Sequence, residues 1–137
     1  MKDIRVALRA YLLDDPVVSG LVSGTRIHHA RLPQDQVEPS VVYVKVSETG
    51  DYHLAGDSGL GQVRMQVDSW AQNADAATDL ANAVYDRLTG AKSIVGTSSD
   101  FVDIRGAFLA NGRDDYDDIT QLYRVSRDFI IWYGASQ

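Results

Sequence analysis

The sequence predicts an α+β fold: an antiparallel sheet of about four to five strands with two main helices packed on one face, in the order α-β-β-α-β-β. Residues 62–68 alternate polar and apolar side chains, which is the pattern of a strand with one buried face. Residues 4–12 and 77–88 carry apolar side chains at helical spacing. The length of 137 residues suits one hydrophobic core, so residues 1–137 are expected to form a single domain.

The first helix is expected near the N-terminus, where the apolar stripe consists of Ile4, Ala7, Leu8, Tyr11 and Leu12. Asp15 followed by Pro16 predicts the N-cap and the first helical position of a short helical turn. Gly20 and Gly24 are expected to end that turn.

A long connection and a hairpin are expected next. Residues 23–40 show no sustained period, which predicts a connection with a short edge strand around Arg26 to Ala30. Residues 40–48 are rich in β-branched side chains and predict a strand that places three valines on one face, Val42, Val44 and Val46. Glycines then predict a wide hairpin tip from Thr49 to Leu60.

The second main helix and two further strands complete the predicted fold. Asn73 is expected to cap a helix, and Gly90 suits its C-terminal left-handed position. The apolar stripe of this helix consists of Ala77, Leu80, Ala81, Val84 and Leu88. Residues 101–110 and 119–133 predict strands separated by an acidic loop at residues 113–118.

Composition excludes several classes of function. The formal net charge is −6, which disfavours a duplex-binding surface because phosphate neutralisation requires clustered Lys and Arg. The absence of cysteine excludes disulfide scaffolds, thiolate zinc sites and cysteine nucleophiles. Neither a signal peptide nor a membrane-spanning apolar run is recognisable, so the protein is expected to be soluble and not exported.

No set of residues predicts catalysis, a metal site or a cofactor site. His28 and His29 are adjacent in an extended segment, so their side chains are expected to point in opposite directions, and His53 is distant in sequence. Residues 56–61, GDSGLG, contain a serine near glycine but lack the strand-turn-helix context of a nucleophile elbow. Consecutive acids at 113–118 are expected to stay solvated or to meet a basic partner. We therefore expect a protein that is not an enzyme.

Three aromatic residues lie at the ends of the predicted strands, Trp70, Trp132 and Tyr133. Large aromatic side chains at such positions most often close the edge of a core. The alternative role, an anchor in a protein interface, stays open. Almost all other strongly apolar positions are assigned to helix stripes or inward strand faces, which predicts polar subunit interfaces of modest size.

The order of several segments resembles the tail completion family of long-tailed phages. The segment from Ala7 to Gln34, ALRAYLLDDPVVSGLVSGTRIHHARLPQ, is followed by PSVVYVKVSE and by HLAGDSGLGQVRMQVDSWA with its alanine-rich helix. The resemblance runs from Ala7 to about Leu88, and the C-terminal third agrees in pattern. Phage-derived particles such as gene transfer agents carry similar proteins, and the family has no catalytic residues to transfer.

The resemblance implies a structural virion protein that caps the head-proximal end of the tail tube as a hexameric ring. Such a ring ends tube polymerisation and mediates head-tail joining. The implied partners are further copies of the chain as a homohexamer, the major tail tube protein and a head-completion or connector protein. DNA passes through the channel without specific binding, and no membrane is involved. The protein is expected in the virion tail after synthesis in the host cytoplasm.

The acidity of the chain agrees with this implication, since six copies at −6 each carry −36, which repels the phosphates of passing DNA. In residues 62–70, the apolar side is expected to face the helices, leaving the polar side for the lumen or a neighbouring subunit. The candidate interface or lumen residues are Arg64, Gln66, Asp68, Asp114, Asp115, Asp117 and Asp118. The roles of His28 and His29 stay open.

Two other functions are retained as alternatives. A tail-tube or minor tail structural subunit would grow long polymers instead of closed rings. A small hydrolase that uses Asp or His is the less favoured alternative.

Overall fold

The computed structural model describes residues 4–36, 38–53, 56–89, 94–96 and 101–134. These residues form three helices and six strands, so the expected order α-β-β-α-β-β is incomplete. The elements are α1 (Ile4–Leu13), α2 (Pro16–Leu21), β1 (Ile27–His29), β2 (Ser40–His53), β3 (Gly56–Ala71), α3 (Ala74–Thr89), β4 (Ile94–Gly96), β5 (Phe101–Asp117) and β6 (Leu122–Gly134).

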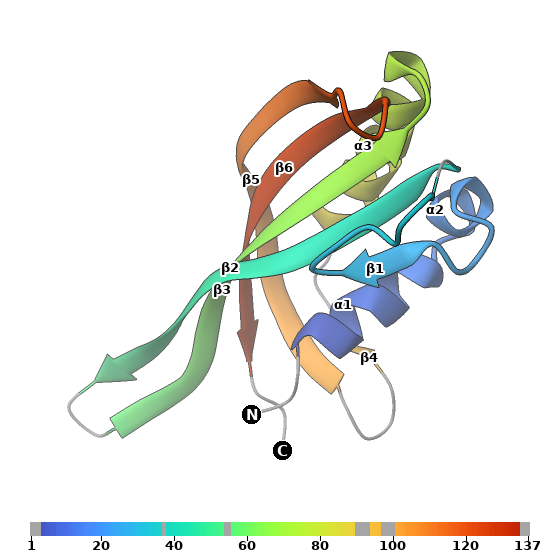
Figure 1. Ribbon diagram of the computed structural model, residues 1–137. Coiled ribbons are helices and arrows are strands. Elements are labelled where there is room, and N and C mark those ends of the chain that lie inside the picture. The colour runs from blue at the N-terminus through green and yellow to red at the C-terminus, as the bar shows by residue number, and fades with distance from the viewer. Residues whose placement is uncertain (1–3, 37, 54–55, 90–93, 97–100, 135–137) are drawn as a thin grey trace.

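The described strands form one sheet in the spatial order β1-β2-β3-β6-β5-β4 (Figure 1). The prediction of four to five antiparallel strands is corrected on two points, because there are six strands and β1 pairs with β2 in parallel. Parallel neighbours need a connection that returns the chain to the same end of the sheet. The connection between β1 and β2 does this, bringing Val41 opposite Ile27.

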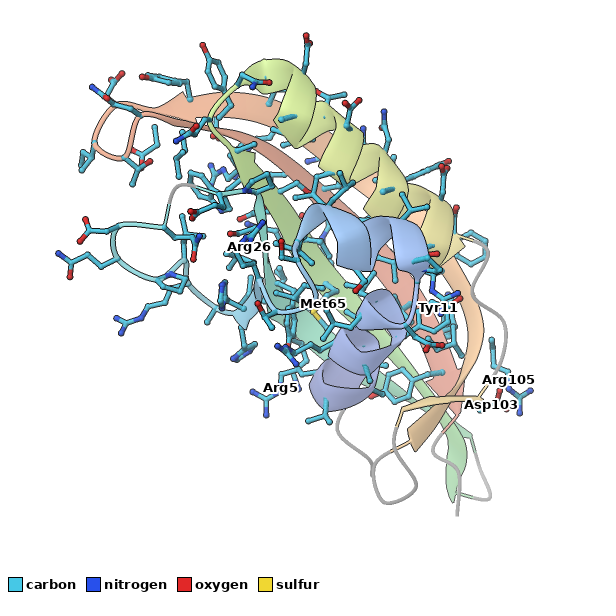
Figure 2. The ribbon with its side chains drawn as sticks, turned by 90° about the vertical axis from the view of Figure 1, so that its right-hand side faces the viewer. Arg5, Tyr11, Arg26, Met65, Asp103 and Arg105 are labelled. Atoms are coloured by element: carbon cyan, nitrogen blue, oxygen red, sulfur yellow. The ribbon has the colours of Figure 1, made fainter. Side chains whose placement is uncertain are left out.

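All three described helices lie on one face of the sheet, as predicted, and Figure 2 shows them in front of it. Helix α3 packs across β3, β6 and β5. The predicted caps are confirmed, since Asp15 Oδ2 accepts a hydrogen bond from the Val18 amide at 3.1 Å and Asn73 Oδ1 accepts one from the Ala76 amide at 2.8 Å. Helix α2 continues through Gly20 to Leu21, and the predicted cap Gly90 lies outside the described residues.

The core forms between the helices and the covered face of the sheet. On β3, the predicted inward residues Val63, Met65 and Val67 are buried. They pack in one cluster with apolar side chains of both longer helices and of β6, including Leu8, Leu12, Leu80, Val84, Phe129, Ile131 and Tyr133. Full burial of each such side chain contributes about 1.5–3 kcal/mol. Residues 62–68 therefore alternate, as predicted, because every second side chain is buried against the helices.

Two segments predicted as loops are strands. The expected tip from Thr49 to Leu60 is mostly paired, because β2 reaches His53 and β3 begins at Gly56. The pairing of β2 with β3 contains two register shifts, between Lys45 and Ser47 and between Gly50 and Tyr52. These shifts allow the pairing to continue through residues that favour turns.

The acidic segment 113–118 is also corrected. Strand β5 continues to Asp117, and Asp115 lies opposite Arg124 of β6, so a cross-strand ion pair offsets part of its charge. The turn that joins β5 to β6 consequently comprises residues 118–121.

The far part of the β2–β3 hairpin extends beyond the body of the molecule, as Figure 1 shows. Pairing between β3 and β6 begins at Leu60, so the described residues before it pair only with β2. The hairpin is thus a two-stranded ribbon that projects from the sheet.

One close contact on the core side gives a stability prediction. A Cβ atom on Gly61 would lie 2.9 Å from Cζ of Tyr133, whose side chain is fully buried. Gly61→Ala is expected to lower the free energy of unfolding by about 1–3 kcal/mol, because the buried ring must shift. Urea unfolding followed by circular dichroism measures this change.

The matched control is Gly20→Ala in α2, where a Cβ atom would meet nothing within 4 Å. That change should be neutral or raise the free energy of unfolding by up to about 1 kcal/mol, since it removes backbone entropy from the unfolded chain. Equal effects of the two substitutions would contradict the assigned packing of Tyr133.

Candidate functional site

The face of the sheet opposite the helices, called the open face here, carries the candidate functional residues. Arg64, Gln66 and Asp68 of β3 lie on it, alternating with the buried residues of the core face as predicted. No described helix packs on this face. Its side chains form a polar network at one end and an apolar patch toward the other.

Arg124 of β6 is the centre of the polar network. Its Nε donates to Asp115 Oδ1 at 3.0 Å, and its Nη2 makes a second, short contact with the same carboxylate. Its Nη1 lies 3.8 Å from Asp68 Oδ2, and its guanidinium carbon lies 5.4 Å from the ring centre of Trp70. The hydrogen bonds to Asp115, followed by the charge of Asp68, raise the pKa of Arg124.

This network explains how Asp68 tolerates burial. Its side chain is only 9% exposed, and a buried carboxylate is costly unless it is paired and hydrogen-bonded. Gln66 Nε2 donates to both carboxylate oxygens at 3.1 and 3.2 Å, while Arg124 supplies the positive charge. The polar groups on the outward side of β3 therefore find most of their hydrogen bonds and counter-charges within the chain.

Arg64 lies in a second ion pair on the open face. Its Nε and Nη2 lie 3.0 and 2.9 Å from Asp128 Oδ2 of the neighbouring strand β6. Replacing Arg64 by Glu would put two carboxylates side by side, so Arg64 is not the freely exchangeable surface position that alternation alone indicates.

An apolar patch adjoins this ion pair and consists of Phe108, Ile130 and Trp132. Phe108 is 61% exposed and Trp132 is 37% exposed. Phe108 and Arg64 flank Ile130 in neighbouring strands, and the Phe108 ring lies over Gly106, where a Cβ atom would be 3.1 Å from it. Aromatic side chains beside arginine are typical of the centre of protein interfaces.

The patch corrects the expectation that almost all strongly apolar positions are turned inward. Phe108 and Ile130 lie on the open face instead. The aromatic residues at the strand ends were predicted either to close the core or to anchor an interface. Tyr133 is buried in the core, whereas Trp132 is partly exposed in the apolar patch. Trp70 lies beside Arg124, in the polar network.

The four acidic candidates predicted within residues 113–118 have different environments. Asp115 joins Asp68 through Arg124, which brings together two groups that are distant in sequence. Asp117 accepts hydrogen bonds from the Thr120 hydroxyl and the Ile119 amide, which lower its pKa. Asp114 and Asp118 are exposed, and no ion pair joins either of them to another described residue.

The end of the open face contains a groove of about 460 Å³. It lies between the β1–β2 connection and the β5–β6 turn, and its lining includes Trp70, Asp35, Asp117 and Ile119. The hydrogen-bonded Asp117 is held in its ionised form, which does not suit a general acid. The described residues contain no group of His, Asp and Glu side chains arranged to hold a metal ion.

The two adjacent histidines lie in β1, at an edge of the sheet. Burial, followed by the charges of Arg9 and Arg26, lowers the pKa of His28. His29 is exposed and its ring lies 5.4 Å from that of Tyr43. Neither histidine belongs to the open-face network.

The comparisons with known proteins identify the family. A model of the family described as tail completion protein gp17 matches residues 6–134. The chain belongs to this tail completion family. The resemblance proposed from the sequence is confirmed, and the match also includes the C-terminal third. The protein is therefore a structural protein of a phage tail.

Solved structures share the fold of this tail completion protein. A chain from a structure described as the virion of a native gene transfer agent particle matches with a TM-score of 0.70 and 17% identity, covering 96% of this chain and 95% of that chain. A second structure, of a protein without a descriptive name, has a TM-score of 0.54 and 15% identity, with coverages of 98% and 94%. None of the curated proteins matches. No described helix is both long and apolar enough to cross a bilayer.

Several residues of the open face were missed from the sequence, namely Phe108, Arg124, Asp128 and Ile130. The alternation of Arg124, Ser126 and Asp128 with Val125 and Phe129 is a signal that β6 has a polar face. It does not reveal which carboxylates Arg124 meets, because that depends on the register of three strands.

Arg124 gives a test of the polar network. Arg124→Gln is expected to lower the free energy of unfolding by about 1–3 kcal/mol, because it leaves the buried Asp68 carboxylate without a cation. Urea unfolding at pH 7 measures the loss.

Arg113→Gln is the matched control. The Arg113 side chain is 58% exposed and its Nε lies 3.8 Å from Asp115 Oδ2, so the change is expected to stay within about 0.5 kcal/mol. An equally small effect of Arg124→Gln would show that the network does not stabilise the fold.

Proposed function

We propose that the protein closes the head-proximal end of the tail tube as a hexameric ring, ends tube polymerisation and provides the surface for head-tail joining. The observation that carries this proposal is the open face of the sheet in a chain of the tail completion family. An uncovered sheet face with Phe108, Trp132 and Arg64 exposed has the chemistry of an assembly surface.

The proposed partners are other copies of this chain, the major tail tube protein on one side and a head-completion or connector protein on the other. A ring requires two different surfaces on each subunit, so that each copy contacts the next in the same way. The remaining open face is then available to the tube or to the head. No residue is proposed as catalytic, and no cofactor is required.

The net charge supports passage of DNA through such a ring. Six copies at −6 each carry −36, and a negatively charged wall does not retain phosphates. The exposed carboxylates Asp114 and Asp118 are available to line a channel or to contact a neighbour. DNA is accordingly proposed to pass without specific binding.

Assembly with the major tail tube protein of the same particle tests the proposal. Purified tube protein is polymerised with and without this chain, and the products are examined by negative-stain electron microscopy. Tubes shortened in proportion to the added chain, with a ring at one end only, are expected. Long open polymers formed by this chain alone would instead support a tube subunit, and unchanged tube lengths would contradict a terminator.

The apolar patch gives a prediction on the same assay. Phe108→Ser is expected to keep the free energy of unfolding within about 0.5 kcal/mol, because most of the side chain is already in water. If the patch is an assembly surface, the substitution should lower ring formation or capping by about tenfold or more, the effect of an interface hot spot.

The control is Val17→Ser on α2, where the side chain is 60% exposed on the helical side of the molecule. This change should leave rings and tube capping as they are. Capping that survives Phe108→Ser as well as Val17→Ser would remove the apolar patch from the proposed assembly surface.

A further inference from the structure

The sheet has two free edges, at the two ends of its strand order. At one edge, β1 pairs only with β2 among the described strands. At the other, β4 pairs with β5 only as far as Asp103, so β5 has no outer strand partner in the described structure from Ile104 to Asp117. Strands β2, β3 and β6 lie between β1 and β5, so the path along the sheet from β1 to β5 is roughly 19 Å at about 4.8 Å per strand.

The β5 edge, defined here as residues 113–119, is acidic. Asp115 is neutralised by Arg124, but Asp114 and Asp118 are exposed without an ion pair to any described residue. Asp117 is held ionised by its hydrogen bonds within the turn. Ile119, at the turn, is 93% exposed and adds an apolar contact point beside these charges.

The β1 edge, defined here as Arg9, Arg26 and Arg31, is basic. Arg9 Nε donates to the Ile27 carbonyl at 3.0 Å, and Arg26 Nε donates to the Pro39 carbonyl at 2.8 Å. These acceptors are neutral carbonyl oxygens, so they supply no negative charge to either guanidinium group. Within the described chain, no carboxylate lies within 4.0 Å of any of the three, and Arg31 is exposed.

Residues near the two edges also bear on the charges there. Burial, followed by the charges of Arg9 and Arg26, lowers the pKa of His28, so both arginines act on the same β1 residue. Asp35 of the β1–β2 connection lines the groove beside Asp117, so the acidic side chains at this end of the open face come from both sides of the groove. Figure 2 shows Arg26 near the helices, apart from the end of the sheet where β5 turns into β6.

We propose that the acidic β5 edge of one copy binds the basic β1 edge of the next copy, head to tail around the ring. This inference rests on the proposed hexameric ring and names the two surfaces that build it. A contact between unlike edges is heterologous, and repetition of such a contact closes a ring when its rotation fits. A two-fold contact between like edges would bring equal charges together and is disfavoured.

Two charge-reversed variants test this pairing. Asp114→Arg with Asp118→Arg makes the β5 edge basic, and Arg26→Glu with Arg31→Glu makes the β1 edge acidic. Either variant alone has like charges at every contact, so its assembly constant is expected to fall by more than about tenfold. Native mass spectrometry at low ionic strength measures the ring population.

Mixing the two variants gives the decisive result. Each acidic edge then finds a basic edge only on the other variant, so the mixture is expected to form six-membered rings with three copies of each in alternation. This recovery also shows that both variants are folded. Rings that fail to return on mixing, or rings that form equally well from either variant alone, would overturn the edge pairing.

Controls separate this inference from the proposed function. Asp75→Arg with Asp79→Arg makes the same change of charge on the exposed side of α3 and should leave rings unaffected. Rings of the unmodified chain that persist in every variant would overturn the pairing but not the ring. Absence of rings in the unmodified chain, even with tube protein, would overturn the proposed function itself.

Arg26 also holds backbone carbonyls, so circular dichroism is recorded for each variant. If Arg26→Glu with Arg31→Glu does not fold, Arg31→Glu is used alone, because Arg31 is exposed and makes no side-chain hydrogen bond in the described structure. This single variant is expected to weaken assembly and to be rescued by the β5-edge variant. Unchanged assembly would contradict the proposal.

Discussion

The placement of every described helix on one face of the sheet is the constraint on which the rest of the structure depends. Each central strand must present apolar side chains to the helices and a different surface to the outside. Strand β3 does this with Val63 and Met65 on one face and Arg64 and Gln66 on the other. The open face is consequently a surface that one chain leaves for its surroundings, and its chemistry is the best guide to what it meets.

The open face satisfies most of its own polar groups. Asp68 is buried, yet Gln66 and Arg124 supply its hydrogen bonds and its counter-charge. The apolar patch has no comparable partner within the described chain, because Phe108 remains largely exposed. At one end of the open face the polar groups are paired within the chain, and toward the other end aromatic side chains are exposed. This combination is typical of an assembly subunit, in agreement with membership of the tail completion family.

The sequence correctly predicted those features that depend on interactions between residues close together in the chain. The caps at Asp15 and Asn73, the inward side of residues 62–68 and the stripe of α3 depend on neighbours in sequence, and all were predicted. Which side chains of β5 reach the open face, and which residues they meet there, depends on the register between the strands. Shifts between Ile104 and Gly106 and between Leu109 and Asn111 change which side chains of β5 face outward, so simple alternation does not place Phe108 or bring Asp115 to Arg124.

Hydroxyl-radical footprinting of the free chain and of the chain assembled on tail tubes tests the central claim most directly. If the open face and the edges of the sheet form the assembly surface, oxidation of Phe108, Trp132 and Ile119 should fall severalfold on assembly. Oxidation of Tyr85 on α3, which is 36% exposed, should stay unchanged. Protection of Tyr85 with continued oxidation of Phe108 and Trp132 would place the assembly surface on the helices and contradict the account.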